Sequence, residues 1–259
     1  QAGRQIGRSR PWGTSFGSSP YEKGDRMMLK LTDADNFRRT ALGLCLIAAP
    51  LVGLVSAFIT PRFTGSIGDE LAAISEHTGS WLIGGFLNLI SFFLFMLAVL
   101  GIVHLLGHRS VILGHVGGGL VLLGAFFHGT IIGFALVEVP LVESGGPRDR
   151  MIEFANQMYE SAAFMMILFP FLGFFLGWIL LAIALWRARV APLWVAATLA
   201  VAPLSEFVGP EAVSPELMLA LFLIALGYLG LKILRLSDRD WQRSDSPTLT
   251  PEAGPSRVA

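Results

Sequence analysis

Three polar side chains lie within long apolar stretches of the sequence, where they could do chemistry that apolar residues cannot. They are Asn88, His128 and Glu206. A carboxyl group and an imidazole in apolar surroundings can exchange a proton near neutral pH. Such a pair could couple the movement of a substrate to protons, or supply acid and base to a lipophilic molecule. We therefore predict a polar pocket lined by these three residues, with Glu138 and Glu160 at its rim. The alternative is that His128 bonds another helix and Glu206 reaches interfacial water.

Six apolar stretches carry or flank these residues, at about residues 40–60, 81–106, 111–137, 162–186, 190–208 and 215–236. Five of them reach the roughly 20 residues that an α-helix needs to cross a bilayer, and the fifth in order is shorter. The chain is 53% hydrophobic and only 15% charged. Backbone groups in lipid must bond within their own segment, so the sequence predicts an all-α, polytopic membrane bundle of six transmembrane helices.

Basic residues gather in every second gap between the stretches. These gaps and the chain ends beside them hold Arg38, Arg39, Arg109, Arg187, Arg189, Lys232, Arg235 and Arg239. The other gaps are acidic and hold only Arg62, Arg148 and Arg150 as basic residues. The positive-inside rule predicts both termini in the cytoplasm and the protein in the plasma (inner) membrane. Counted along their helices, Asn88, His128 and Glu206 then share the outer leaflet.

The segments outside the stretches divide into ordered gaps and polar ends. Residues 63–80 and 150–161, in outer gaps, have the apolar spacing of short amphipathic helices, which would either cap the bundle as a lid or serve as simple connectors. Residues 1–26 are predicted to be disordered and, if translation starts at Met27 or Met28, lie upstream of the natural protein. Residues 27–39 form a cytoplasmic segment, and residues 237–259 a disordered cytoplasmic tail.

Glycine and proline mark where helices pack closely and where they bend. Small-residue pairs at a spacing of four predict close helix packing at Gly114 with Gly118, Gly129 with Gly133, and Gly173 with Gly177. The glycine-rich third stretch is therefore predicted to be the central helix of the bundle, and a homodimer contact through the same faces is the alternative. Pro50, Pro170 and Pro203 are predicted to interrupt the first, fourth and fifth stretches, either as tolerated kinks or to expose carbonyl groups to a cavity.

Two histidines at the inner turn between the second and third stretches are weak candidates for a metal site or axial haem ligation. His104 and His115 fall at similar depth on adjacent antiparallel helices. His128 is about 220° around the third helix from His115, which disfavours two stacked haems. No metal and no cofactor are predicted. The few scattered basic residues exclude a nucleic-acid partner, so the expected partners are membrane lipid and a small lipophilic ligand.

The fourth stretch leads into Arg189-Val190-Ala191-Pro192-Leu193-Trp194, a basic turn with proline and tryptophan opening the next helix. With the histidine-bearing hairpin and the amphipathic outer gap, residues 38–236 resemble a broad group of uncharacterised six-span bacterial membrane proteins. That resemblance implies architecture and no activity. Three function classes stay open: binding or transport of a small lipophilic or proton-coupled substrate, an intramembrane enzyme acting on a lipid or isoprenoid, and a non-catalytic membrane subunit. Whether any reaction is catalysed stays open too.

Overall fold

The computed structural model describes residues 34–63, 65–207, 214–237 and 241, and in this part of the chain every regular element is helical. The elements are α1 (Ala34–Ile59), α2 (Ile67–Glu76), α3 (Thr78–Leu106), the 3₁₀ helix η3 (Gly107–Ser110), α4 (Val111–Glu143), α5 (Arg148–Tyr159), α6 (Ala162–Arg187), α7 (Leu193–Val201), the 3₁₀ helix η4 (Ala202–Phe207) and α8 (Ser214–Arg235). Helices lie at all six positions of the apolar stretches, with α7 and η4 together filling the fifth. The predicted all-α class is confirmed.

Four helical stretches of the described residues are long and apolar enough to cross a membrane. They are Asn36–Ile59, Thr78–Glu143, Ala162–Arg187 and Pro215–Arg235. The second contains both α3 and α4, which are joined by η3 and pack against each other. The stretch Leu193–Glu206 is apolar but shorter. Length and composition thus define an all-α, multi-pass membrane protein.

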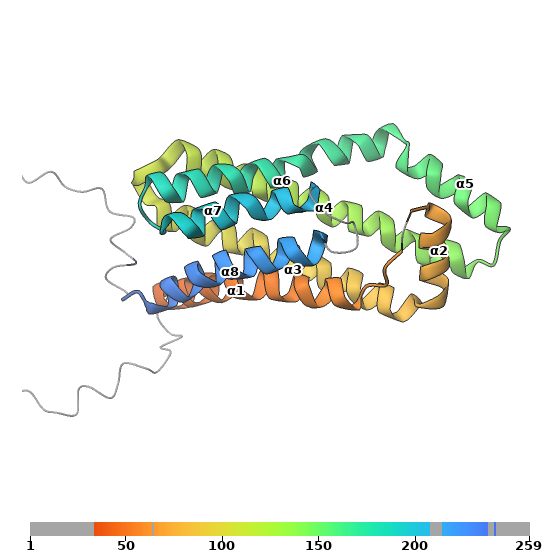
Figure 1. Cartoon of the computed structure of the whole chain (residues 1–259), viewed down its shortest axis with the longest axis horizontal. Coiled ribbons are helices and arrows are strands. Elements are labelled where there is room, and N and C mark those ends of the chain that lie inside the picture. Colours follow the sequence, from red (N-terminus) through yellow and green to blue (C-terminus); the bar gives the residue numbers. More distant parts are fainter. Residues whose placement is uncertain (1–33, 64, 208–213, 238–240, 242–259) are drawn as a thin grey trace, which may run out of the picture.

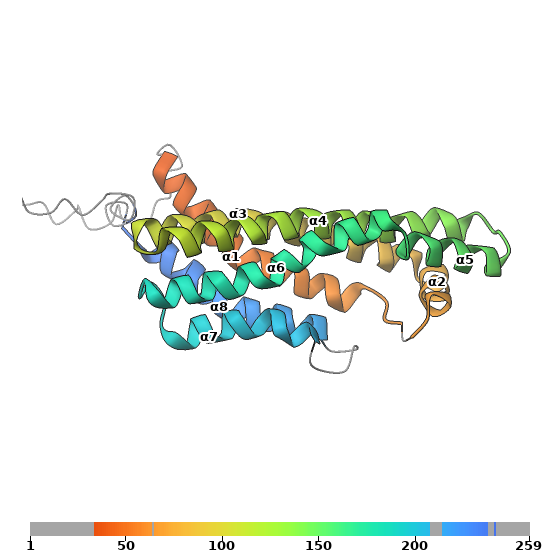
Figure 2. The same cartoon turned by 90° about the horizontal axis from the view of Figure 1, so that it is seen from above.

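The long helices form a ring in which each packs against the next. The neighbours in order are α1 with α3, α3 with α4, α4 with α6, α6 with α7, α7 with α8, and α8 with α1. Figures 1 and 2 show these helices running along the longest axis of the molecule, with α2 and α5 gathered at one end. The prediction that the third stretch is a central helix is wrong, because α4 occupies one place in the ring like its neighbours.

Most of the basic residues lie at one end of the ring. The start of α1, the η3 turn, the α6–α7 turn and the end of α8 lie at the end opposite α2 and α5 (Figure 1). That end carries Arg38, Arg39, Arg109, Arg187, Arg189, Lys232 and Arg235. Gly107 permits the tight η3 reversal there, since its φ of +48° lies in the region that glycine adopts without steric cost.

The closest backbone approach in the ring is between α4 and α6, and glycine makes it possible. A Cβ atom at Gly124 would lie 2.3 Å from the backbone nitrogen of Phe174, and one at Gly177 would lie 2.7 Å from the carbonyl oxygen of Gly117. The same device joins α8 to α1, where a Cβ at Gly230 would lie 2.6 Å from the carbonyl oxygen of Gly43. Small residues at such contacts maximise van der Waals packing between helices in lipid.

The close helix contacts predicted at six glycines are present at four of them. A Cβ atom would come within 2.6–3.4 Å of a neighbouring helix at Gly114, Gly118, Gly173 and Gly177. The prediction is wrong for Gly133, which is exposed and where a Cβ would meet nothing within 4 Å. Gly129 makes only an ordinary contact, at 3.7 Å from Leu89. Gly117 and Gly124, the α4 glycines at which α4 approaches α6 most closely, fall outside the predicted pairs.

Aromatic side chains fill the centre of the ring in place of a central helix. Phe95 of α3, Phe174 and Trp178 of α6, and Phe222 of α8 are all 1% exposed or less. Their ring centroids are 5.1–6.2 Å apart in mostly edge-to-face arrangements, which aromatic pairs prefer. This cluster links three helices that are not neighbours in the ring.

The two amphipathic helices predicted in the acidic gaps are present as α2 and α5, and they form a second small core. Ser66 and Asp69 make a capping box that starts α2. Leu71 and Ile74 of α2 then pack with Trp81 and Val139 at the ends of α3 and α4. In both views α2 lies across the long axis (Figures 1 and 2).

Proline interrupts the helices at fewer places than predicted. Pro50 and Pro170 lie inside the continuous helices α1 and α6. Only Pro203 coincides with a change of structure, where α7 gives way to the 3₁₀ turns of η4. Pro203 has no N–H to continue the α-helical hydrogen bonding, and the chain proceeds there in 3₁₀ turns.

Of the predicted disordered tail, residues 237–259, the structure describes Ser237 and Trp241. Trp241 is 2% exposed and its ring lies 4.0 Å from that of His104. The prediction is therefore wrong at this position, because a single large apolar side chain finds a place in the core beside α3. Residues 238–240 and 242–259 of the tail, and the predicted disordered segment 1–26, lie outside the described residues. The predicted cytoplasmic segment 27–39 overlaps α1, which begins at Ala34.

Substituting glycines of α4 separates packing from helix propensity. We expect Gly124→Ala to lower the free energy of unfolding of the purified protein by about 1–3 kcal/mol or more, and with it the melting temperature, since its Cβ would collide with the backbone of α6. Gly133→Ala is the matched control on the same helix, and we expect it to be neutral or stabilising by up to about 1 kcal/mol. Equal melting temperatures for the two variants would contradict the packing described here.

Candidate functional site

A cavity of about 470 Å³ lies inside the ring between α1, α3, α4, α6, η4 and α8. It occupies the half of the bundle nearer α2 and α5, since it is lined by the end of α1, the first half of α3 and the start of α8. Its volume falls within the roughly 300–1,000 Å³ of typical small-molecule sites. It exists because the ring has no central helix and the aromatic cluster fills only part of the centre.

Asn88, His128 and Glu206, predicted from the sequence to share a pocket, all line this cavity. They come from α3, α4 and η4, three elements that are far apart along the chain. The 3₁₀ turns after Pro203 bring Glu206 to the cavity near the end of its element. The structure therefore brings together the three residues on which the predicted pocket depends.

Two of these residues have buried polar atoms that lack a partner. The Nδ1 atom of His128 and the Oε2 atom of Glu206 are buried and form no hydrogen bond within the described residues. Ser56 and Ser91, in contrast, donate hydrogen bonds of 2.8 Å to the carbonyl oxygens of Gly84 and Ala49. A buried polar group without a partner costs about 1–3 kcal/mol. A ligand that supplied the missing hydrogen bonds would therefore be stabilised here.

Aromatic rings hold His128 in place. Its imidazole stacks on Phe92, with ring centroids 3.7 Å apart and an angle of 20° between the planes. Phe171 also packs against the imidazole, with centroids 4.9 Å apart and an angle of 38° between the planes. These two contacts restrict the orientation of the ring at the cavity wall.

The rest of the wall is largely aromatic and was not predicted. Phe92, Phe95, Phe174 and Phe222 line the cavity. Beneath them lies the fully buried Trp178, whose indole nitrogen has no hydrogen-bond partner among the described residues. The sequence contains 19 phenylalanines, and nothing in their spacing separates those that face the cavity from those that face lipid.

A salt bridge between Arg62 and Glu216 borders the cavity and was also not predicted. Both residues line it, and their side chains are 2.5 Å apart. The Arg62 side chain is 54% exposed, so this edge of the cavity is open to solvent. Arg62 was the one basic residue in its acidic gap, a signal that could have suggested an acidic partner.

Glu138 and Glu160, predicted at the rim of the pocket, do not line the cavity. Glu138 is 1% exposed and accepts a 2.8 Å hydrogen bond from the hydroxyl of Tyr159 on α5. Glu160 is exposed at the end of α5. The rim prediction is wrong because α4 continues through Pro140 to Glu143, which carries Glu138 to the small core around α2 and α5.

The composition of the cavity wall also bears on whether α2 and α5 form a lid or serve as connectors. Neither helix contributes a residue to the cavity wall. Each packs instead on the other and on the ends of the long helices. The structure therefore favours the connector interpretation of these helices over a lid, with the added role of burying Glu138.

The environment of Glu138 extends to a second carboxyl group on α2. Burial, and to a lesser extent the nearby Glu138 carboxylate, raises the pKa of Glu70 to about 7. Burial and the Glu138 carboxylate likewise raise the pKa of Tyr159 above its ordinary value. The carboxyl groups of Glu70 and Glu138 and the phenol of Tyr159 thus lie in one partly buried interface between α2, α4 and α5.

The two histidines considered for metal or haem have different surroundings. His104 stacks on Trp241. His115 is exposed, and its Nδ1 lies 2.7 Å from the carbonyl oxygen of Val111. Among the residues that the structure describes, no group of three or more His, Cys, Asp or Glu side chains suits a metal ion.

Comparison of the chain with known proteins found no match. No protein-family model matches the chain, no curated protein matches it, and no solved structure matches it.

The docking of α2 is expected to depend on pH. A carboxyl group whose pKa is raised by folding stabilises the folded state below its unfolded pKa, and this contribution is lost as pH rises through the folded value. Hydrogen exchange of residues 67–76, corrected for the intrinsic rate, should therefore show more protection at pH 5 than at pH 8.

The Glu70→Gln variant should lose most of this pH dependence. Glu76→Gln, which changes an exposed acid at the end of the same helix, is the matched control and should keep it. Wild-type protection that does not change between the two pH values would contradict the assignment of Glu70 as a partly buried acid with a raised pKa.

Proposed function

We propose that the protein binds or transports a small lipophilic molecule that carries a polar or proton-exchanging group, and that the cavity between α1, α3, α4, α6, η4 and α8 is the binding site. One observation carries this proposal: Asn88, His128 and Glu206 line a single cavity whose remaining wall is largely aromatic. A mostly apolar site with a few convergent polar groups is the usual composition of a small-molecule pocket.

The polar atoms indicate which kind of group the ligand carries. Glu206 and His128 each offer a buried atom without a partner, so a ligand hydroxyl, amine or carbonyl at that end would complete their hydrogen bonds. Phe92, Phe95, Phe174 and Phe222 would contact the apolar part. Glu206 and His128 could also exchange a proton with the ligand, which is the basis for proton-coupled movement. The same pair in one cavity is compatible with acid and base catalysis on a lipid, and turnover abolished in Glu206→Gln would favour that alternative.

We further propose that the chain crosses the plasma membrane six times with both termini in the cytoplasm. The ring of α1, α3, α4, α6, α7 with η4, and α8 supports this, since its basic residues lie at the end where α1 starts and α8 ends. The acidic α2 and α5 would then face outward, and the cavity would lie in the outer leaflet. The resemblance of residues 38–236 to uncharacterised six-span bacterial proteins is consistent with this topology.

Ligand binding can be tested with an apolar fluorescent amine, N-phenyl-1-naphthylamine, added to the protein in lipid nanodiscs. A ligand that binds only the folded state raises the melting temperature, so we expect the wild type to be stabilised. Ala57→Phe, which would fill the cavity, and Glu206→Gln, which removes its carboxylate, should weaken binding at least about three-fold, a loss of about 0.7 kcal/mol, and so reduce the shift.

Glu160→Gln is the matched control, because Glu160 is an exposed acid outside the cavity. It should retain the wild-type shift. A shift of the same size in Ala57→Phe would show that the probe binds elsewhere and would remove the cavity from consideration.

The topology can be tested by cysteine labelling, since Cys45 is the only cysteine in the sequence. In a Cys45→Ser background, a membrane-impermeant maleimide should label Ser75→Cys and Ser144→Cys on intact cells. Both positions are exposed and lie toward the α2 and α5 end. Ser237→Cys, after α8, should be labelled only when the cells are broken. The opposite pattern would reverse the orientation.

A further inference from the structure

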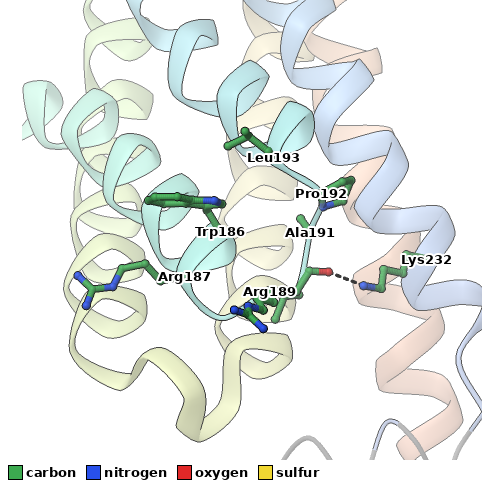
Figure 3. Close-up of a pocket in the computed structure, with 8 residues that line it drawn as sticks. Trp186, Arg187, Arg189, Ala191, Pro192, Leu193 and Lys232 are labelled. Atoms are coloured by element: carbon green, nitrogen blue, oxygen red, sulfur yellow. Dashed lines mark hydrogen bonds between the residues drawn. The ribbon is translucent and has the colours of Figure 1, made fainter.

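A second pocket, of about 500 Å³, lies at the basic end of the bundle where α6 turns into α7 (Figure 3). Its wall includes Trp186, Arg187, Arg189 and Lys232. Three positive side chains therefore share one concave surface. None of the three forms a salt bridge within the part of the chain that the structure describes.

No acidic side chain of the described residues neutralises the positive charges of this pocket. Lys232 reaches across from α8 and donates a hydrogen bond to the carbonyl oxygen of Val190 (Figure 3). An ammonium group has three donors, so two stay available after this bond. Arg39, at the same end of the bundle, differs, because its guanidinium binds Asn36 and the carbonyl oxygen of Leu236.

The position of Arg189 is conformationally costly. Its φ is +54°, and it is the one non-glycine residue with a positive φ among those described. The N–H of Arg189 bonds the carbonyl of Trp186, and the N–H of Val190 bonds the carbonyl of Leu185. This pair of bonds is the Schellman arrangement that ends a helix, and glycine is the residue that usually occupies the place of Arg189. The turn thus keeps a positive side chain where the backbone alone would favour glycine.

The surroundings of the pocket are those of a membrane interface. Trp186 is 54% exposed, Leu193 64% and Trp194 49%, and these residues flank the basic turn. Tryptophan is enriched at the level of the lipid headgroups, because its ring is apolar and its N–H is polar. The basic residues at this end of a membrane bundle therefore lie at the depth of lipid phosphates.

We propose that this pocket binds the phosphate group of an anionic phospholipid. The guanidinium of Arg189 and the ammonium of Lys232 would bind the phosphate oxygens, with Leu193 and Trp186 against the glycerol and the start of the acyl chains. Basic pockets between transmembrane helices bind anionic headgroups through this combination of charge and apolar contact. Arg187 points away from Lys232 in Figure 3, so it would contact the headgroup layer beside the bound lipid. This inference does not depend on the ligand proposed for the cavity.

The test is lipid binding by purified full-length protein, counted by native mass spectrometry during titration with phosphatidylglycerol or phosphatidylcholine. The wild type should bind phosphatidylglycerol more tightly than phosphatidylcholine. Arg189→Gly and Lys232→Gln should each weaken phosphatidylglycerol binding about five-fold, the effect expected of one basic residue near anionic lipid. Lys232→Arg keeps the charge and should restore it.

Arg189→Gly separates binding from folding, because glycine adopts a φ of +54° without strain. Its melting temperature should equal or exceed that of the wild type while its lipid selectivity falls. Arg235→Gln is the matched control, an exposed basic residue at the same end that does not line the pocket. Equal binding of the two lipids, or undiminished phosphatidylglycerol binding by Arg189→Gly, would overturn the proposal. Complete displacement by millimolar inorganic phosphate would also overturn it, by identifying free phosphate as the occupant.

Discussion

Every polar side chain inside this bundle needs a hydrogen-bond partner, because neither lipid nor an aromatic interior provides one. Ser56 and Ser91 meet this requirement by bonding carbonyl groups across the α1–α3 contact, so they join two helices. His128 and Glu206 do not meet it within the described chain. The same constraint therefore separates polar residues that hold the ring together from polar residues that are left for something else to satisfy.

The packing of the ring depends on glycines, which have no side chain, as much as on bulky residues. Gly117, Gly124 and Gly177 allow the backbones of α4 and α6 to touch, and Gly43 with Gly230 does the same for α1 and α8. Helices drawn so closely together at the circumference leave no room for another helix at the centre. Aromatic rings from α3, α6 and α8 fill that centre only in part, and the remaining volume is the cavity.

The sequence could predict the positions of the helices and the grouping of three cavity residues. Apolar length fixes each helix, and a constant rise per residue fixes how deep a side chain lies. These two quantities place Asn88, His128 and Glu206 in the same half of the membrane. They do not fix rotation or helix order. Hydropathy therefore could not distinguish the packed Gly124 from the exposed Gly133, or reveal that α1 and α8 are neighbours.

The salt bridge between Arg62 and Glu216 joins the end of α1 to the start of α8 on the solvent side of the cavity. With Arg62 54% exposed, such a pair contributes only about 0–1 kcal/mol, which is close to thermal energy. Separation of this pair would therefore cost little free energy at this edge of the cavity. The residence time of an occupant would then be set by its own contacts with the aromatic wall. Added salt, which screens exposed pairs, would leave the occupant's hold on that wall nearly unchanged.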